Sequence, residues 1–354
     1  MYIKKTTVIL IFSILAVFLL FSAVYTIGIG STDIPLGTVY GILKDKIIND
    51  GKAIEAGIYS IPHYQIIWNI RLPRVVFGVL CGMGLAMCGA VMQALVLNPI
   101  ADPYILGISS GASAGAAWAL LMPLPFFAGQ YQVTFTAMIG ALLSTFCVYT
   151  MAKAGGRGKL QPIALLLSGT AVNAVMSAVT SLLIFLAKSH ESIAAVYNWQ
   201  MGSLASAQWN TIWIPFAGVA TGFVIFSMSG KKLNIVMMGD EDAMSLGINL
   251  KNFRTFMFTI CSVVVASLVS VTGIIGFVGL IIPHIVRLLV KSSNNIIVIP
   301  LSALAGSIYM IWTDSIARSL FGAAELPLGI ITAFIGAPFF LYLMIKRSCG
   351  GNDE

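Results

Sequence analysis

The sequence predicts an all-α polytopic membrane protein with about ten transmembrane helices. Hydrophobic residues make up 58% of the 354 residues and charged residues only 9%. Soluble proteins carry about 25% charged residues, so a water-soluble fold of this length could not cover its surface. Apolar runs close to the roughly 20 residues that cross a bilayer recur along the whole chain. No linker separates them, so we expect one membrane domain over residues 1–354.

The expected spans follow one another in order. The first run, about 8–27, is longer than the apolar part of a signal peptide, so we expect it to be retained as a helix. The other apolar runs lie near 75–97, 104–122, 132–152, 162–187, 211–228, 253–272, 274–290, 297–317 and 327–345. The long segments 29–69 and 189–208 are then outer loops, and 229–254 is the longest inner loop.

The basic residues predict that both termini lie in the cytoplasm. An even number of spans places both ends on one side of the membrane. With the N-terminus inside, thirteen Lys and Arg residues fall in inner loops and seven in outer ones, in agreement with the positive-inside rule. The net charge of +7 comes from scattered residues with no basic run, so we do not expect nucleic acid as a partner.

Two prolines break the chain after the second span. The Asn98-Pro99 and Asp102-Pro103 pairs interrupt helical hydrogen bonding. Backbone groups freed at membrane depth must be covered by protein or water. Gly107, Gly111 and Gly115 follow at intervals of four and would let another backbone approach one helix face. Two interpretations remain open: a tightly packed connection, or a helix that lines a water-filled path.

The inner loop contains a predicted helix of about two turns outside the membrane. Asp240 can cap its N-terminus, and Glu241 and Asp242 suit the positive end of the helix dipole. Ala243, Met244 and Leu246 would supply a small apolar face, and Gly247 would end the helix. The segment is either a solvated connector or a helix that inserts into a groove of a cytoplasmic partner.

Three arginines fall at the outer ends of spans. Arg71 and Arg74 bracket Pro73, and Arg318 lies four residues after Asp314. An ion pair between Asp314 and Arg318 is one interpretation. Arginine also suits recognition of carboxylates, so a docking surface is the other.

The chain lacks the signatures of catalysis and of metal binding. It has no phosphate-binding loop and no nucleophile–base motif. Its five cysteines form no CxxC pair, and His284 has no second histidine at ligand spacing. We therefore expect a non-catalytic protein without a cofactor or a resident metal, and energy for any transport must come from another subunit.

Five motifs together carry a resemblance to a known family. They are RLPR (71–74), GAVMQALVLNPIADPYILGISSGA (89–112), GDEDAMSLG (239–247), GFVGLIIPHIVR (276–287) and ELPLGIITAFIGAPFF (325–340). The chain resembles the FecCD-type permeases of ABC importers for iron-siderophores, haem and cobalamin, from the first helix to Lys346. Its outer segment 30–69 is longer than is usual in that family.

The resemblance implies a type II ABC importer permease fold and several partners. These are a second copy of the chain in a homodimer, two cytoplasmic ATPase subunits that hold ATP and Mg, and an extracytoplasmic substrate-binding protein. Contact with the ATPase is expected at Gly239, Asp240, Glu241, Asp242, Ala243, Met244, Leu246 and Gly247. Docking of the binding protein is expected at Arg71, Arg74 and Arg318. The translocation path and the packing around it are expected to involve Gln93, Asn98, Pro99, Asp102, Gly107, Ser110, Gly111 and Gly115.

The expected function is import of an iron chelate, a ferric siderophore or haem, across a bacterial cytoplasmic membrane. Cobalamin is the alternative cargo, and an oxyanion such as molybdate is a more distant one. A secondary transporter driven by an ion gradient is the alternative from another class. The absence of an intramembrane carboxylate pair argues against it.

Overall fold

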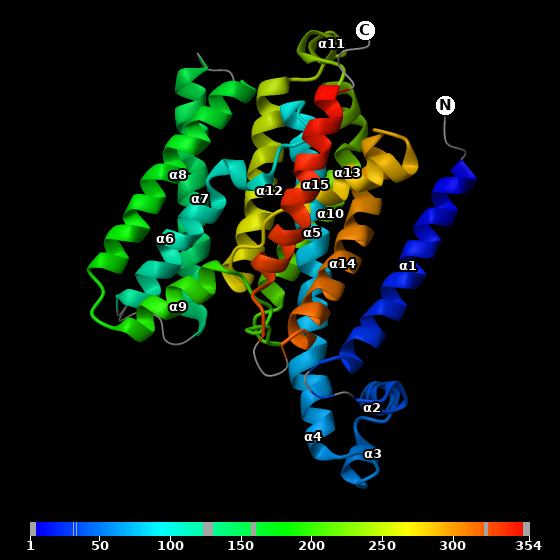
Figure 1. The fold of residues 1–354 in the computed structure, drawn as a ribbon. Coiled ribbons are helices and arrows are strands. Elements are labelled where there is room, and N and C mark those ends of the chain that lie inside the picture. The colour runs from blue at the N-terminus through cyan, green and yellow to red at the C-terminus, as the bar shows by residue number, and fades with distance from the viewer. Residues whose placement is uncertain are drawn as a thin grey trace.

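The ten expected spans are helices in the structure. The computed structural model describes residues 5–30, 32, 34–122, 130–156, 161–321 and 325–349, and these contain helices but no strands. The ten apolar helices are α1 (Lys5–Gly28), α5 (Leu72–Val96), α6 (Ile108–Leu121), α7 (Gln130–Gly155), α8 (Pro162–Phe185), α10 (Trp213–Val236), α12 (Leu250–Thr272), α13 (Val278–Val290), α14 (Asn295–Ser319) and α15 (Leu328–Cys349) (Figure 1). Seven are long and apolar enough to cross a membrane, and α6, α13 and the apolar part of α15 are shorter.

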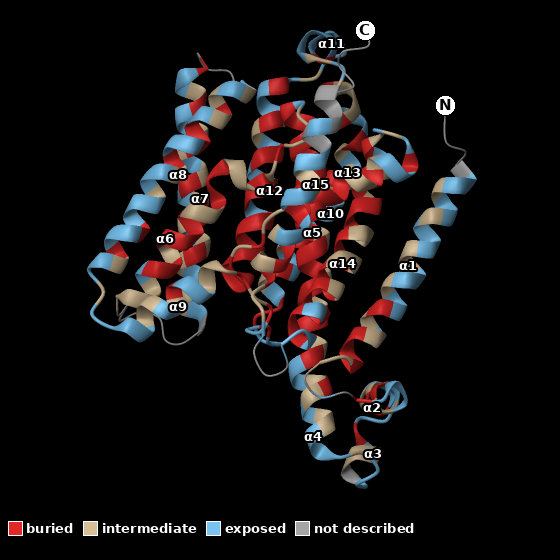
Figure 2. Ribbon diagram, in the orientation of Figure 1, coloured by how far each residue is buried: buried red, intermediate tan, exposed pale blue. Residues whose placement is uncertain are grey.

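Helix α5 forms the centre of the bundle. Its side chains are buried along almost the whole length, and Figure 2 shows the buried residues gathered around it. Two glycines allow neighbouring backbones to touch it. A Cβ atom on Gly82 would collide with the backbone of Gly306 in α14, and one on Gly89 would collide with the backbone of Gly279 in α13. These contacts without intervening side chains are typical of membrane helices.

Helices α6, α7 and α8 form a lobe at one side of α5, with α9 (His190–Gln200) across its outer end (Figure 1). Helix α6 lies inside the lobe and contacts the other three. Helix α7 joins the lobe to the rest of the bundle by packing against α12.

The outer segment between α1 and α5 is folded rather than an open loop. It contains α2 (Leu36–Ile48), α3 (Lys52–Glu55), α4 (Ile61–Tyr64) and a π-helical turn, η1 (Gln65–Arg71), that continues into α5. A small separate core holds it together, formed by Ile27, Ile34, Val39, Ile42, Ile67, Val75 and Ile311. Buried Asp45 accepts hydrogen bonds from the backbone N–H groups of Ala53 and Ile54, at 3.1 to 3.3 Å, and so fixes the start of α3.

The remaining short helix, α11 (Asp240–Ser245), lies at the opposite end of the bundle. The start of α1 and the end of α15 lie at that same end, and α2 to α4 lie at the other (Figure 1). The described helices therefore agree with the even number of crossings that the sequence predicts.

Candidate functional site

Helix α11 is held to the bundle by one buried residue and one ion pair. Ala243 is fully buried against Val236 and Leu250. The two carboxylate oxygens of Asp240 accept hydrogen bonds from the guanidinium of Arg254 on α12, at 2.7 and 3.0 Å. Arg254 is buried and Asp240 is half-exposed. This attachment fixes α11 relative to the spanning helices, so a force on α11 acts directly on α12.

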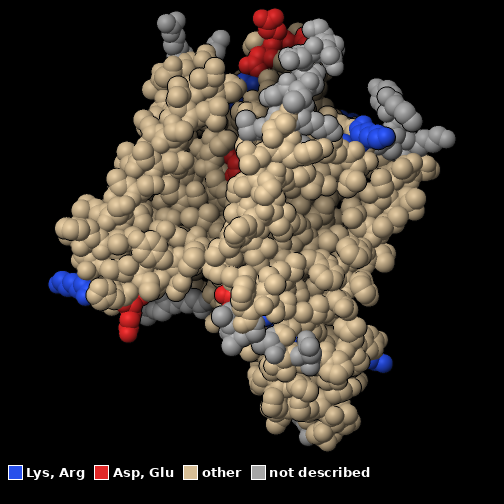
Figure 3. Space-filling view, viewed as in Figure 1, with Lys and Arg blue, Asp and Glu red and all other residues tan. Residues whose placement is uncertain are grey.

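Two expectations for α11 were wrong in detail. Asp240 does not cap the helix, because Gly239 is the N-cap residue and makes no side-chain cap bond. Ala243 is not part of an exposed apolar face, because it packs inward. Met244 and Leu246 do remain exposed, at 55% and 59%. Glu241 and Asp242 are exposed beside them, and Figure 3 shows acidic side chains gathered at this end of the molecule.

Two glycines set the ends of this element. Gly239 has φ +124° and Gly247 has φ +81°, and L-residues with side chains rarely adopt these values. Gly239 turns the chain out of α10, and Gly247 ends α11 as the sequence predicts. Between these glycines, α11 and its C-cap Leu246 expose acidic side chains together with the apolar side chains of Met244 and Leu246.

The connection from α5 to α6 is irregular, as its prolines predict. The Oδ1 atom of Asn98 accepts a hydrogen bond from the N–H of Ile100 at 3.1 Å. The Oδ1 atom of Asp102 accepts one from the N–H of Tyr104 at 2.8 Å and caps the 3-10 helix η2 (Pro103–Leu106). Both polar side chains thus stabilise turns in the chain itself, and Pro99 lies half-buried between them.

The glycine face of α6 lies against α7. Added Cβ atoms on Gly111 and Gly115 would collide with the backbones of Gly140 and Thr136. Ser144 of α7 donates a hydrogen bond to the carbonyl of Gly107 at 2.7 Å. This face is closed by protein, so it does not line an open path in this conformation.

Ser110 lies on another face of α6. Its hydroxyl is 2.6 Å from Oδ1 of Asn173 on α8 and 3.1 Å from the carbonyl of Gly107. Ser110 therefore links α6 to α8 by a hydrogen bond within the lobe.

A second irregular segment, residues 273–277, separates α12 from α13. Gly273 has φ +69°, and Phe277 has φ +68° although it carries a side chain. The hydroxyl of Tyr104 donates a hydrogen bond to the carbonyl of Ile275 at 3.0 Å. The two interruptions of helical structure are therefore joined by a direct hydrogen bond.

A groove of about 690 Å³ lies beside this second segment. It is lined by Gln200, Met201, Ile274, Gly276, Phe277, Gly329, Ile330, Ala333, Phe334, Ala337 and Pro338. None of these side chains is charged, and many are small. Phe334 is 78% exposed. The surface is chemically suited to contact with a bulky cargo or with another copy of the chain.

A smaller cavity of about 320 Å³ lies near α11 and is more polar. It is lined by Gln93, Leu97, Asn98, Pro99, Met237, Met238, Gly239, Arg287 and Ser293. The amide nitrogen of Gln93 donates to the carbonyl of Leu280 at 3.1 Å, and its oxygen accepts a hydrogen bond from Arg287. Three residues expected from the α5–α6 stretch thus meet at this cavity.

The outer arginines are at the expected end of the bundle, but their side chains are buried. Arg71, Arg74 and Arg318 are only 3% to 5% exposed. Arg71 donates hydrogen bonds to the carbonyls of Ile27 and Gly28 at 2.9 Å. It therefore holds the end of α1 against the start of α5.

Arg74, Asp314, Arg318 and Glu325 form a cluster, named here the outer charge cluster. Nε of Arg74 is 2.7 Å from Asp314 Oδ1, and its Nη1 is 2.8 Å from Glu325 Oε2. Arg318 Nε lies 3.0 Å from Asp314 Oδ2, which confirms the expected i, i+4 pair. Two arginines and two carboxylates cancel in formal charge, so this group is neutral as a whole.

The structure brings into these regions several residues that had no expected site role. Arg254, Arg287, Asn173 and Glu325 are all partners of expected site residues. Arg254 and Asp240 both fall in the predicted inner loop 229–254, so their opposite charges could have indicated an ion pair. The other three contact residues far away in the chain, which one sequence cannot reveal.

The described residues provide no group of three His, Cys, Asp or Glu side chains that could hold a metal ion. His284 instead packs edge-on against Phe339, with ring centroids 6.2 Å apart.

Ten apolar helices, interrupted by two irregular segments with an uncharged groove beside one of them, are typical of a polytopic membrane transport protein. The family model for the FecCD transport family matches residues 14–346, and the chain belongs to that family. The members of this family are permease subunits of ABC importers, which confirms the resemblance found from the motifs.

Three relatives show the range of the family. The chain is 41% identical to a cobalamin import system permease protein of Halobacterium salinarum, over 80% of this chain and 74% of the relative. It is 34% identical to a hemin transport system permease protein of Yersinia pestis, over 79% and 84%. It is 35% identical to an Fe(3+)-citrate import system permease protein of Bacillus subtilis, over 97% and 96%.

A solved structure also matches the whole fold. It is described as an inward-facing conformation of a metal-chelate type ABC transporter. It has a TM-score of 0.80 and 29% sequence identity, and the match covers 95% of this chain and 99% of that one.

Proposed function

We propose that this chain moves an iron chelate, a ferric siderophore or haem, through a path between two copies of itself. The observation that carries the proposal is the uncharged groove beside residues 273–277. Its volume of about 690 Å³ suits a bulky ligand, and its small side chains leave the surface open. One copy supplies half of a path, and a second copy facing it would close the other half.

In this proposal the energy comes from two partner ATPase subunits, which hold ATP and Mg, so the chain itself is not an enzyme. Helix α11 is the coupling element. Exposed Met244 and Leu246 would enter a groove in the ATPase, and exposed Glu241 and Asp242 would contact its rim. The ion pair of Asp240 with Arg254 would transmit movement to α12.

The end of the bundle that carries α11 is then cytoplasmic, and so are both termini. The distribution of basic residues supports this orientation. The folded segment α2 to α4 is the outer surface, where a substrate-binding protein would dock. Because the three arginines are buried and bonded within the chain, Arg71 to backbone carbonyls and Arg74 and Arg318 to Asp314, we infer that they position this surface. Exposed carboxylates such as Glu325 would contribute to its contacts.

Cobalamin is the second candidate cargo. The relative with 41% identity is a cobalamin permease, whereas the iron-citrate relative matches over more of the chain at lower identity. Both cargoes are large metal complexes, so the uncharged groove does not choose between them. The binding protein that delivers the cargo is the component expected to distinguish them.

The test is ATP-dependent uptake into proteoliposomes that contain the permease, its ATPase and its binding protein. Labelled haem, ferric siderophores and cobalamin are compared, and binding of each by the binding protein is measured in parallel. Ala333→Trp should fill the groove and abolish uptake. Leu20→Trp, on the exposed side of α1, is the matched control and should leave uptake unchanged. Uptake driven by an ion gradient without ATP would contradict the proposal.

A further inference from the structure

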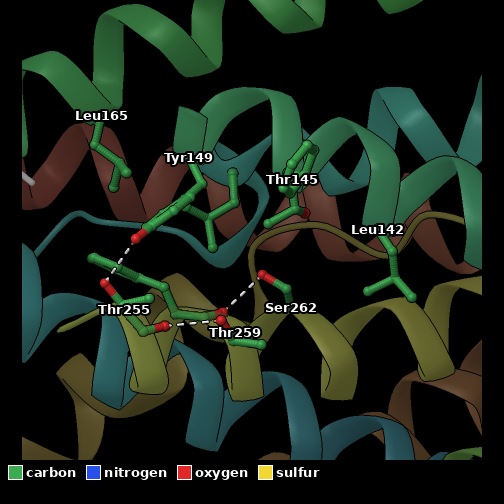
Figure 4. Close-up of a pocket in the computed structure, with 10 residues that line it drawn as sticks. Leu142, Thr145, Tyr149, Leu165, Thr255, Thr259 and Ser262 are labelled. Carbon is green, nitrogen blue, oxygen red and sulfur yellow. Dashed lines mark hydrogen bonds between the residues drawn. The ribbon is translucent and has the colours of Figure 1, made fainter. Parts of the chain in front are cut away.

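A separate pocket lies between α7 and α12, on the half of these helices nearest α11. Its volume is about 300 Å³. It is lined by Leu106, Leu142, Thr145, Phe146, Tyr149, Leu165, Thr255, Phe258, Thr259 and Ser262 (Figure 4). Phe146 is 63% exposed and Thr259 is also exposed, so the pocket is open beside these two residues. The groove of the proposed cargo path shares no lining residue with it.

The wall of this pocket offers little to a polar ligand. The hydroxyls of Thr145, Thr259 and Ser262 each donate to a carbonyl one turn earlier in their own helix, at 2.8 to 2.9 Å. Tyr149 and Thr255 hydrogen-bond to each other across the pocket at 3.2 Å. Polar groups already paired in this way leave mainly carbon surface, which favours a hydrocarbon occupant.

Two lysines lie just beyond the polar end of the pocket. Lys153 is one helical turn after Tyr149, and its Nζ lies 5.9 Å from the centre of the Tyr149 ring. Lys251 is one turn before Thr255, whose hydroxyl donates to the Lys251 carbonyl at 2.7 Å. Within the described part of the chain, neither lysine makes an ion pair with a carboxylate. Each of the two helices that border the apolar pocket therefore carries a lysine one turn beyond the Tyr149–Thr255 hydrogen bond.

We propose that this pocket binds an anionic diacyl phospholipid, with one acyl chain between α7 and α12 and the phosphate between Lys153 and Lys251. The lysines lie near the ends of spanning helices, which is the level of the lipid headgroups. Basic residues at that level attract anionic lipids. The ligand comes from the bilayer, and its binding requires no contact with the transported cargo.

The test uses native mass spectrometry of the full-length permease in mixed micelles. Phosphatidylglycerol and phosphatidylcholine with identical acyl chains are compared, and inorganic phosphate is tested alone. We expect the wild-type protein to retain phosphatidylglycerol in clear preference to phosphatidylcholine. Replacing both cations, Lys153→Gln with Lys251→Gln, should reduce that preference by about 30-fold, since each basic residue near an anionic headgroup contributes a factor of about five.

Two further variants separate the parts of the site. Lys231→Gln with Lys232→Gln removes two exposed lysines of α10 and should leave the preference unchanged. Thr259→Phe should fill the pocket and reduce retention of both lipids, and thermal unfolding of this variant would show that the protein remains folded.

Equal retention of the two lipids by the wild-type protein would overturn the proposal. So would an equal loss of preference in the Lys231/Lys232 control, which would show general attraction by surface charge. Competition by inorganic phosphate with no effect of Thr259→Phe would mean that only a phosphate binds, which also contradicts a lipid site.

Discussion

The two ends of the molecule use charged residues in opposite ways. At the outer end, Arg74 and Asp314 are each less than 5% exposed and bind each other. At the inner end, Glu241 and Asp242 are exposed, and Asp240 alone is paired. Charge at the outer end holds helices together, whereas charge at the inner end remains available to another protein. The local sequences do not reveal this difference, because the partners Arg74 and Asp314 are 240 positions apart in the chain.

The largest effect is expected from Asp314→Asn in the outer charge cluster. It would leave Arg74 and Arg318 buried with a single carboxylate, Glu325, which contacts only Arg74. Breaking a buried ion pair in this way costs about 3–5 kcal/mol. Thermal unfolding in detergent should show a large loss of stability. Asp50→Asn, in an exposed pair with Lys46, is the control and should change stability by about 0–1 kcal/mol. Equal effects of the two changes would show that the outer cluster is not structural.

The contact between uncharged residues of α6 and α7 gives a reference value of stability for the comparison of the two ends. Gly111→Leu would force α6 away from α7, because the backbone of Gly140 and the side chain of Ser144 occupy the space. Overpacking of this kind costs about 1–3 kcal/mol. The measurement is again thermal unfolding, with Gly37→Leu as the control, since a Cβ atom at Gly37 meets nothing within 4 Å. Unchanged stability of Gly111→Leu would mean that this face is free to move apart.

The inner ion pair should matter less for stability. Asp240→Asn removes the charge that faces Arg254, but Asp240 is half-exposed and water can replace part of the interaction. We expect a loss of about 1 kcal/mol. We also expect weaker coupling, measured as ATP hydrolysis by the assembled complex in the presence and absence of loaded binding protein. A loss of stability as large as that of Asp314→Asn would remove the contrast between the two ends.

The smallest effect on stability is expected from Met244→Asp. Because the side chain is 55% exposed, the free energy of unfolding should change by less than about 0.5 kcal/mol. Uptake should nevertheless be lost, since the change places a charge in the proposed contact with the ATPase. Met228→Asp, at an exposed position of α10, is the control. It would place a charge among the apolar side chains of a spanning helix and should lower stability, which shows that the unfolding measurement detects destabilisation. Normal uptake by Met244→Asp would place the ATPase contact elsewhere.

The sequence was sufficient for the spans and for the interruption between α5 and α6, whereas it placed residues 274–277 inside a span. Apolar length, the Asn98-Pro99 and Asp102-Pro103 pairs, and the position of Gly247 all depend on neighbours in the chain, so local chemistry predicts them. The burial of the outer arginines could not be predicted in that way. Arg74 meets Asp314 and Glu325 across 240 and 251 positions of sequence, and only the packing of α5 against α14 brings them together.

The fold of the outer segment could not be predicted from the sequence either. The sequence predicts only a long outer loop here, but the segment has a small core that depends on Ile27, Val75 and Ile311, which belong to three different spanning helices. Apolar residues at the ends of spans are expected to face lipid, and nothing local marks these three as contacts for α2.

The backbone contacts of α5 restrict how the protein can change shape. Gly82 touches the backbone of Gly306, and Gly89 touches that of Gly279, so α5, α13 and α14 cannot slide along one another by even a fraction of a turn without a collision. We therefore expect α5, α13 and α14 to move together as one rigid body. We expect rotation at the irregular connections beside these helices, residues 97–102 and 273–277, and Tyr104 of η2 links the two regions by its hydrogen bond to Ile275. Because this hydrogen bond joins the two interruptions, we expect them to move together.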